Sequence, residues 1–314
     1  MKKIRAGVVG VGAMGRHHAR IYSGMRSVEL VGVADTNMGI ANEVAAEYDT
    51  EAFGDCEHLL REDLDAISIA VPTSLHKSVA LKAANYDVHT LIEKPIAESL
   101  KSADTIIEVA RRANLKLMVG HIERFNPAVV KLNELISAGE LGELLSISCR
   151  RVGPYPPRIR DVSIIIDLAV HDIDTISHLY GKRAMSVYAA AGNSFHIEED
   201  YASILLKYNG NKSGFVETNW LTPHKMRTLT ATGTGGAASA DYLAQSLEVW
   251  KESGRREVEI EKSEPLKLEL THFMDAIARD TVPEPSGEAG KYVLHVAIAA
   301  IKSHKKGKSI HLNA

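Results

Sequence analysis

The first 120 residues alternate short apolar runs with longer segments of helical periodicity. The apolar runs are nearly continuous in valine, isoleucine and leucine, and they cover residues 4–12, 29–35, 66–72, 88–94 and 115–120. Such runs are typical of strands buried on both faces, and their alternation with helices is typical of a parallel sheet between two helix layers. The pattern predicts a doubly wound parallel sheet in an α/β domain over residues 1–120.

A second pattern of longer strand-like segments begins at residue 144, with segments at 144–153, 186–193, 201–208, 213–220, 227–234 and 246–251. The turns at 209–212 and 233–236 are too short for the crossover that parallel strands need, which predicts antiparallel pairing. Helical periodicity covers 167–180, 265–280 and 290–307, and a last short strand is expected at 309–312. Residues 121–314 are therefore expected to form a second α/β domain around a large, mostly antiparallel open sheet.

Composition narrows the classes of partner. The 314-residue chain has a net charge of −3 and only 5% aromatic residues, so no nucleic-acid or membrane contact is predicted and small-molecule chemistry is favoured. The two cysteines, Cys56 and Cys149, are isolated, which fits a reducing compartment and argues against a thiolate metal site. No apolar segment approaches the ~18 residues of a membrane span, and no signal-peptide core opens the chain. We expect a cytoplasmic protein.

Three glycines follow the first apolar run in a G-x-G-x-x-G spacing, in the stretch GVVGVGAMGRHHAR. In such a motif Gly10 permits the tight turn, Gly12 lets the backbone approach a pyrophosphate, and Gly15 allows a helix to pack closely on a strand. Glycines also mark ordinary turns, so the spacing alone is a weak signal. Its place between the first strand and the first helix of a βαβ unit predicts a dinucleotide site with phosphate at the helix N-terminus.

The second apolar run ends in VADTN, which places Asp35 twenty residues after Gly15. An acidic residue at this distance accepts hydrogen bonds from the ribose hydroxyls of a bound dinucleotide. Aspartate also repels a 2′-phosphate, and its neighbours Thr36 and Asn37 include no arginine to bind one, so NAD is favoured over NADP. The alternative is that Asp35 merely ends a strand in a turn.

Oxidation of an alcohol by a dinucleotide needs a group that takes the hydroxyl proton and a cation or donor that orients the oxygen. In LIEKPIA, Lys94 lies at the carboxyl end of a predicted buried strand, where Pro95 stiffens the turn. Pro72 and Thr73 end a neighbouring predicted strand, and open α/β sheets bind ligands at this edge. Lys94 is therefore a candidate for catalysis, although most lysines at strand ends are merely solvated.

In IIIDLAVHDID, three residues recur at i, i+4 and i+7 and are predicted to share one helical face: Asp167, His171 and Asp174. A carboxylate one turn from a histidine can orient the imidazole and raise its basicity. A metal site is one alternative, but a further ligand at recognisable spacing is missing. A surface Asp–His pair without function is the other.

Six stretches carry a resemblance to a known family: GVVGVGAMGRHHAR, VADTN, VPTSLH, LIEKPIA, GHIERFNPA and DLAVHDID. They occur in the same order as in the Gfo/Idh/MocA family of sugar and cyclitol dehydrogenases, and the resemblance covers nearly the whole chain. Its specific part is the E-K-P tripeptide together with the later D-x-x-x-H. The resemblance implies an NAD-binding Rossmann domain and a second domain whose open sheet carries substrate and forms the contacts of a homodimer or homotetramer.

The same resemblance assigns roles to the candidate residues. It makes Lys94 a catalytic or substrate-orienting residue, His171 the general base, and Asp167 a partner of His171 and of the substrate hydroxyl. Many members have glycine within D-x-G-x-H where this chain has Ala169, whose methyl group should narrow the site slightly. The predicted cofactor contacts are Gly10, Gly12, Ala13, Met14, Gly15, Asp35, Pro72, Thr73, His76, Glu93 and Lys94.

The substrate is predicted from the stretch CRRVGPYPPRIRDVS at 149–163, which places four arginines around three prolines. Guanidinium forks match phosphate oxygens, so a phosphate-bearing substrate is predicted, with Arg158 and Arg160 among its ligands. Together with GHIERFNPAV, the stretch resembles the branch of the family that acts on UDP-N-acetyl sugars. That resemblance implies oxidation of the 3-hydroxyl of UDP-N-acetylglucosamine to a 3-keto sugar. The expected substrate contacts are Arg124, Arg158, Arg160, Asp167 and His171.

Several alternatives stay open. The arginines could bridge subunits or cap the sheet, and Arg124 could serve phosphate, cofactor or structure. An inositol or unphosphorylated-sugar dehydrogenase is the nearest alternative enzyme. A non-catalytic redox sensor that only binds NAD is the alternative from another class, but such a protein would need neither Lys94 nor His171.

Overall fold

The computed structural model describes residues 3–155 and 162–312. The chain divides into two compact units, Met1–His121 with Leu266–Tyr292 and Ile122–Pro265 with Val293–Ala314. The first break lies one residue from the expected boundary between 120 and 121. The segment 266–292, however, belongs to the first unit, whereas the sequence pattern places it in the second.

The segment 266–292 belongs to the first unit because it covers an edge of that unit's sheet. The N–H of Val119 donates to the carbonyl of Pro285 at 2.9 Å, and Met118 forms an antiparallel bridge with Ser286. An edge strand presents unpaired backbone groups, and a chain segment laid against it satisfies them. Helical periodicity in 265–280 could not reveal which sheet the segment would cover.

The first unit contains a six-stranded parallel sheet in the order β3-β2-β1-β4-β5-β6, as predicted for a doubly wound domain. Its strands are β1 (Ile4–Val9), β2 (Val28–Ala34), β3 (Glu51–Phe53), β4 (Ala66–Ile69), β5 (His89–Glu93) and β6 (Leu117–Gly120). Strand β3 escaped prediction because it has only three residues, none of them buried.

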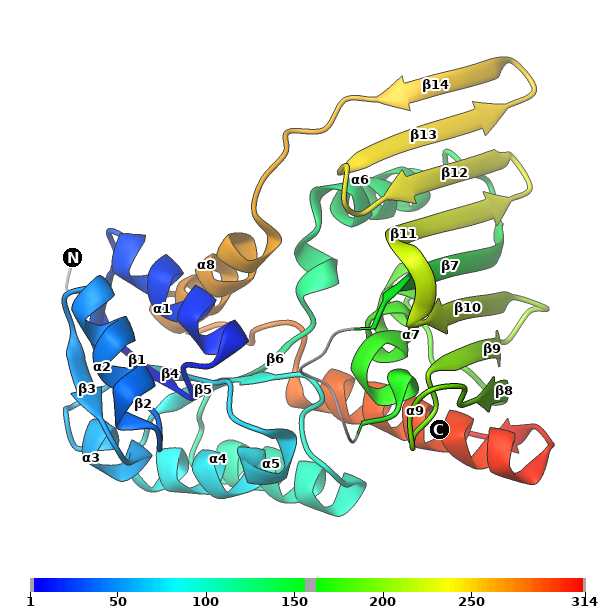
Figure 1. Ribbon diagram of the computed structural model, residues 1–314. Coiled ribbons are helices and arrows are strands. Elements are labelled where there is room, and N and C mark those ends of the chain that lie inside the picture. Colours follow the sequence, from blue (N-terminus) through cyan, green and yellow to red (C-terminus); the bar gives the residue numbers. More distant parts are fainter. Residues whose placement is uncertain (1–2, 156–161, 313–314) are drawn as a thin grey trace. The chain divides into compact units, whose positions relative to one another are not determined.

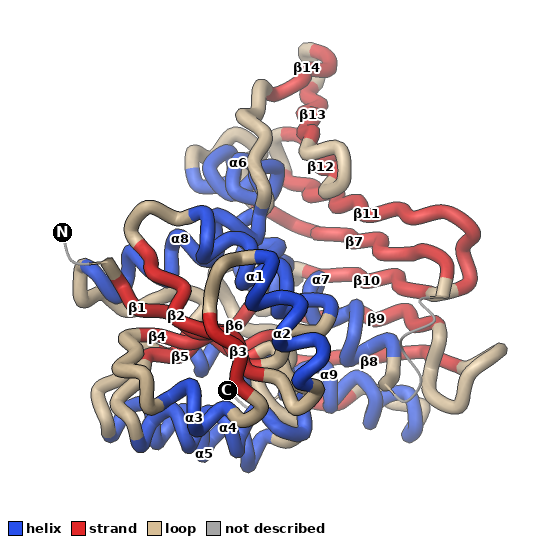
Figure 2. Tube along the Cα trace, turned by 60° about the vertical axis from the view of Figure 1, so that its left-hand side comes forward, coloured by secondary structure: helices blue, strands red, loops and turns tan. Residues whose placement is uncertain are grey.

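The helices of the first unit are α1 (Ala13–Gly24), α2 (Met38–Glu47), α3 (Cys56–Leu60), α4 (His76–Asn85), α5 (Leu100–Arg112) and α8 (Pro265–Ala278), with a 3₁₀ turn at Thr73–Leu75. Helices α3, α4 and α5 line one face of the sheet, and α1 and α8 lie on the other (Figures 1 and 2). Polar caps start three of these helices: the side chains of Asn37, Asp55 and Ser99 accept from the N–H groups of Gly39, Glu57 and Ser102.

The second unit contains a nine-stranded sheet in the order β14-β13-β12-β11-β7-β10-β9-β8-β15. Its strands are β7 (Leu144–Pro154), β8 (Ser186–Gly192), β9 (Tyr201–Lys207), β10 (Ser213–Asn219), β11 (Leu221–Gly233), β12 (Gly236–Asp241), β13 (Ser246–Lys251), β14 (Gly254–Val258) and β15 (Ile310–His311). Only β7 and β10 pair in parallel among these strands, which confirms the mostly antiparallel prediction. Strands β12 and β14 escaped prediction because one is rich in alanine and the other is polar and exposed.

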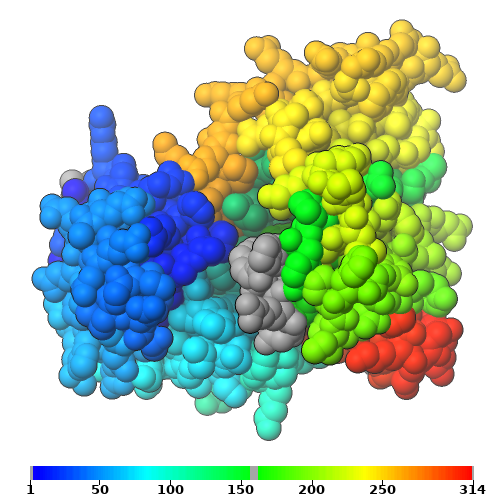
Figure 3. Space-filling view, viewed as in Figure 1, coloured from blue at the N-terminus to red at the C-terminus, as the bar shows by residue number. Residues whose placement is uncertain are grey.

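Helices cover one face of this sheet: α6 (Pro127–Ser137), α7 (Val170–Tyr180) and α9 (Gly287–Lys306), which begins in the first unit (Figure 2). The alternation of burial follows from this arrangement, since Ala202, Ile204 and Leu206 of β9 are buried and the residues between them are exposed. Figure 3 shows parts of the strands, coloured green to yellow, at the molecular surface. No helix in residues 3–155 and 162–312 is both long and apolar enough to cross a membrane.

Candidate active site

The glycine loop of the first unit has the geometry that a dinucleotide requires. Gly10 has a φ of +84°, and a Cβ there would lie 2.7 Å from the carbonyl oxygen of Ala70. A Cβ on Gly15 would lie 1.7 Å from the carbonyl oxygen of Gly10, so helix α1 could not pack in place. Gly12 faces open space, and a Cβ there would have no contact within 4 Å. The loop therefore leaves room for a phosphate at Gly12.

The N-terminus of α1 provides donors for that phosphate. Gly12 caps the helix without a side-chain hydrogen bond, and the first turn contains no acidic residue. Exposed N–H groups at a helix N-terminus bind anions. Asp35, after β2, accepts from the N–H of Val11 at 3.0 Å and from that of Asn37 at 2.9 Å. These residues fit a dinucleotide, with a carboxylate fixed beside the glycine loop.

His76 joins the loop after β4 to the turn that follows β5. Its ring nitrogens lie 3.0 Å from the carbonyl oxygens of Pro95 and Val71, and its side chain is 1% exposed. Burial lowers its pKa, although the backbone partners oppose that shift. The peptide bond between Lys94 and Pro95 is cis. Because carbonyls of its own unit face both nitrogens, His76 positions the Lys94 turn, and its expected contact with the cofactor stays a prediction.

A buried chain of polar groups holds Glu93, the residue before Lys94. His18 is fully buried, with Nε2 at 3.0 Å from Oε1 of Glu93 and Nδ1 at 2.9 Å from Oγ of Ser68. The Tyr22 hydroxyl lies 2.7 Å from the same Oγ. Burial raises the pKa of Glu93, but the hydrogen bond and charge of His18 outweigh it, so the carboxyl is more acidic than usual.

Sequence reasoning missed the role of His18, because no partner lies at a convincing spacing along the chain. A signal was present, since Gly15, His18, Ala19 and Tyr22 follow the spacing of one helical face and all four are buried. A histidine on the face that carries the close-packing glycine has to find a polar partner on the sheet.

In the second unit the D-x-x-x-H stretch is not a uniform α-helix. Asp167 lies in a π-turn at Ile165–Ala169, and His171 lies in the first turn of α7. Both residues are half-buried, and π-turns inside helices occur frequently at functional sites. Asp174, the third residue of the expected common face, lies in α7 with His171 and is 1% exposed. The π-turn changes the helical period between Asp167 and α7, so the expected spacing of 3.6 residues per turn does not hold from Asp167 to His171.

Arg124 forms an ion pair with the buried Asp174. The Nε and Nη2 groups of Arg124 donate to the two carboxylate oxygens of Asp174 at 2.8 and 2.6 Å. A bidentate pair of this kind gives Arg124 a structural role. Arg158 and Arg160, the other arginines expected to bind substrate, lie outside the described residues.

Arg150 and Arg151, the first two arginines of the stretch 149–163, belong to strand β7, in the segment 144–153 that the pattern predicts as a strand. Their side chains point to opposite faces of the sheet because successive strand residues alternate. Arg150 is exposed and pairs with Glu217 at 3.1 Å, whereas Arg151 is 2% exposed.

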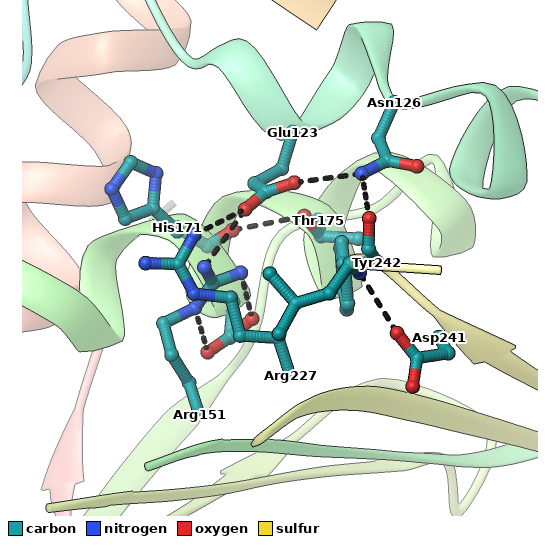
Figure 4. Close-up of polar contacts among 10 residues, drawn as sticks. Glu123, Asn126, Arg151, His171, Thr175, Arg227, Asp241 and Tyr242 are labelled. Atoms are coloured by element: carbon teal, nitrogen blue, oxygen red, sulfur yellow. Dashed lines mark hydrogen bonds and ion pairs between the residues drawn. The ribbon is translucent and has the colours of Figure 1, made fainter. Parts of the chain in front are cut away.

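Arg151 centres a buried cluster of charged groups (Figure 4). Its Nε and Nη2 each donate to Asp172 at 2.9 Å, and its Nη1 donates to Glu123 at 2.8 Å. Burial alone would lower the pKa of Arg151, but the two carboxylates raise it well above its ordinary value. Arg227 lies at the same cluster, with Nη1 3.8 Å from Oε1 of Glu123. Sequence reasoning named Arg151 only as one arginine of the stretch 149–163. It missed the cluster because 28 residues separate Glu123 from Arg151, and Arg227 lies on another strand.

Comparisons with known proteins agree with this architecture. Residues 4–121 match a family described as an oxidoreductase family with an NAD-binding Rossmann fold, and residues 129–239 match the GFO/IDH/MocA C-terminal domain. The chain belongs to the Gfo/Idh/MocA family, and it is an NAD-binding oxidoreductase.

Several relatives cover nearly the whole chain. UDP-N-acetylglucosamine 3-dehydrogenase of Acidithiobacillus ferrooxidans is 33% identical over 308 residues, covering 95% of this chain and 96% of the relative. The NAD⁺-dependent scyllo-inositol 2-dehydrogenase of Bacillus subtilis is 27% identical, covering 99% and 97%. The solved structure of the A. ferrooxidans enzyme matches with a TM-score of 0.91 over 98% of this chain and 99% of that one. A levoglucosan dehydrogenase with NADH and levoglucosan has a TM-score of 0.92 at 20% identity over 100% of both chains, a likeness of fold.

Proposed function

We propose that this protein oxidises a secondary hydroxyl of a nucleotide sugar, namely the 3-hydroxyl of UDP-N-acetylglucosamine, and produces a 3-keto sugar. The main support for this class of substrate is the similarity to the UDP-N-acetylglucosamine 3-dehydrogenase of A. ferrooxidans, which is 33% identical over 95% of the chain. The half-buried Asp167 and His171, four residues apart where the π-turn meets α7, support the chemistry.

Bound NAD would accept the hydride that leaves the oxidised carbon. His171 takes the hydroxyl proton as this C–H bond breaks and the C=O bond forms. Asp167 orients the imidazole and accepts a hydrogen bond from the hydroxyl. Lys94 is assigned to catalysis or to the orientation of substrate, and Glu93 and His76 hold the turn that carries this lysine.

The cofactor is assigned to the glycine loop and its neighbours. The N–H groups around Gly12, Ala13 and Met14 would bind the pyrophosphate, and Asp35 would accept from the ribose hydroxyls. Pro72 and Thr73 follow β4, the strand next to β1 in the sheet, and are assigned to the same site. Arg158 and Arg160 remain proposed ligands of the substrate phosphates.

An oligomer is proposed to cover the open face of the second unit's sheet. Tyr188, Leu205 and Phe215 are opposite one another on β8, β9 and β10 and are 44%, 48% and 39% exposed. A contiguous apolar row on a sheet face is typical of a surface that a partner covers. A second copy of the chain, in a homodimer or homotetramer, is the partner we propose.

A second candidate is oxidation of a free polyol, which the likeness to a scyllo-inositol 2-dehydrogenase favours. NADH formation, measured by absorbance with UDP-N-acetylglucosamine, UDP-glucose, myo-inositol and glucose, separates the two. We expect turnover of the UDP-N-acetyl sugar, with kcat lowered about 10²–10⁴-fold in His171→Ala. Lys94→Ala should also lower kcat strongly.

Binding of NAD, measured by calorimetry in the same variants, is the matched control. The His171→Ala protein should bind NAD as the wild type does, because His171 is assigned to proton transfer. Turnover of free polyols alone would contradict the nucleotide-sugar proposal. Tight NAD binding without turnover of any of the four compounds would favour the redox sensor.

A further inference from the structure

Arg227 occupies an unusual place for a structural cation. It lies on β11 directly opposite Arg151 on β7, and both side chains reach the same charged cluster. Like charges directly opposite on neighbouring strands are destabilising. The two arginines are nevertheless opposite each other here, although the Arg151 guanidinium already donates hydrogen bonds to both buried carboxylates.

Arg151 alone makes most of the hydrogen bonds that the two buried carboxylates accept from arginine. It makes three hydrogen bonds, two to Asp172 and one to Oε1 of Glu123. The other oxygen of Glu123 lies 3.3 Å from the amide nitrogen of Asn126, whose N–H donates to it. The hydrogen-bonding demands of the carboxylates are thus met mainly without Arg227.

The Arg227 guanidinium itself keeps unused donors. Its ion pair with Glu123 is 3.8 Å long, and within residues 3–155 and 162–312 its guanidinium N–H groups make no hydrogen bond. Its side chain is 36% exposed, so solvent or a ligand reaches it. An arginine has five N–H donors in a rigid fork that matches the oxygens of a phosphate or carboxylate.

The position of Arg227 relates it to the residues proposed for proton transfer. In Figure 4 its side chain runs past Arg151 toward Glu123, on the side of the cluster where His171 is drawn. Burial and the charge of Arg151 lower the pKa of Arg227, and the charges of Glu123, Asp172 and Asp167 oppose that shift. Asp167 is therefore within electrostatic range of the guanidinium.

We propose that Arg227 binds an anionic group of the substrate beside the Asp167–His171 pair. The group that binds is a planar or tetrahedral oxyanion. This inference rests on the proposed function, under which the oxyanion is a phosphate of the nucleotide sugar. A carboxylate on the sugar ring is the other source of the same chemistry. The guanidinium fork would select substrates that carry such a group over neutral polyols.

The first test measures anion binding without turnover. Inorganic pyrophosphate and glucuronate are titrated by calorimetry into NAD-loaded wild type, Arg227→Gln, Arg227→Lys and Arg255→Gln. Arg255 lies on the edge strand β14 with a 56% exposed side chain and serves as the matched control. We expect Arg227→Gln to weaken pyrophosphate binding about tenfold or more, Arg227→Lys to weaken it less, and the control to leave it unchanged.

The outcomes separate the two anion sources. A loss confined to glucuronate would assign Arg227 to a sugar carboxylate instead of a phosphate. Unchanged affinity for both anions in Arg227→Gln, or no binding of either by the wild type, would overturn the proposal. Thermal melting of each variant checks folding, and Arg227→Lys keeps the charge should the glutamine variant unfold.

Steady-state kinetics then distinguish this inference from the proposed function. In Arg227→Gln, KM for UDP-N-acetylglucosamine should rise about tenfold with kcat within a few-fold, while the constants for any neutral polyol stay the same. Equal loss of kcat with charged and neutral substrates would overturn the role in anion binding. A wild type that oxidises no nucleotide sugar contradicts the proposed function, and the calorimetric result still decides whether Arg227 binds anions.

Discussion

His18 shows how a single buried residue can position a neighbouring turn. Its imidazole bridges Ser68 on β4 and Glu93 at the end of β5, 50 and 75 residues away in the chain. Without it, the carboxylate of Glu93 would lose the imidazole as a hydrogen-bond partner in a part of the unit where polar groups need one. The turn that presents Lys94 begins at that carboxylate, so its position depends on His18.

We therefore expect His18→Ala to lower the free energy of unfolding by about 2 kcal/mol or more, because a cavity forms and Glu93 loses its donor. Urea denaturation measures the loss, and His17→Ala, which changes an exposed neighbour, should leave the free energy of unfolding nearly unchanged.

The pH dependence of this loss follows from the pKa of Glu93, which is lower in the folded protein than its ordinary value of 4.5. The ionised carboxylate therefore stabilises the fold above pH 4.5, and that contribution disappears as the pH falls. The gap between wild type and His18→Ala should narrow below that pH, and a gap that widens would refute this account.

At the scale of elements, the three glycines of the loop between β1 and α1 are of two kinds. Two are required by the packing of the protein, and one is not. Gly10 and Gly15 are required by the fold itself, since a side chain at either would collide with backbone. Gly12 is not, because space surrounds it. Under the proposed function, Gly12 is the position where the pyrophosphate comes close to the backbone.

Gly12→Ala should accordingly weaken NAD binding about tenfold or more while leaving the melting temperature of the cofactor-free protein nearly unchanged. Gly24, at the other end of α1, also faces open space and provides the control. Gly24→Ala should bind NAD normally and gain up to about 1 kcal/mol of stability. Calorimetry and thermal melting give both quantities, and equal NAD affinity in Gly12→Ala and wild type would exclude the loop as the pyrophosphate site.

Periodicity predicted most elements but not their interruptions. The apolar runs identified five of the six parallel strands, and the turn at 209–212 identified the hairpin of β9 and β10. The turn at 233–236 also joins antiparallel strands, although its second strand, β12, escaped prediction. The π-turn at Ile165–Ala169 was invisible, because nothing local in IIIDLA distinguishes it from an α-helix. Its presence depends on how the segment packs, since tertiary contacts override local preference.

At the scale of the whole molecule, the open face of the nine-stranded sheet is the feature that bears on assembly. The apolar row of Tyr188, Leu205 and Phe215 has hydrophobic side chains exposed to solvent in the isolated chain. Burial of such side chains contributes about 25 cal/mol per Å². A second copy of the same face provides a matching apolar surface.

Leu205→Glu should therefore shift the protein toward smaller species, because it places a carboxylate within that row. Size-exclusion chromatography with light scattering measures the mass. Leu268→Glu makes the same chemical change at a 37% exposed position on α8 and should leave the mass unchanged. A wild type that is monomeric at micromolar concentration, or a Leu205→Glu protein with the wild-type mass, would contradict an assembly through this face.

The sequence by itself determined the features that depend on local pattern: the parallel strands, the glycine loop with Asp35, and the Asp167–His171 spacing. Tertiary structure alone decided the pairings between distant residues. It placed 266–292 against the edge of the first sheet, joined His18 to Glu93, and gathered Glu123, Arg151, Asp172 and Arg227 into one cluster. The physical reason is that periodicity and turn chemistry act over a few neighbouring residues, whereas the partner of a buried charge depends on which strands and helices the complete fold brings together.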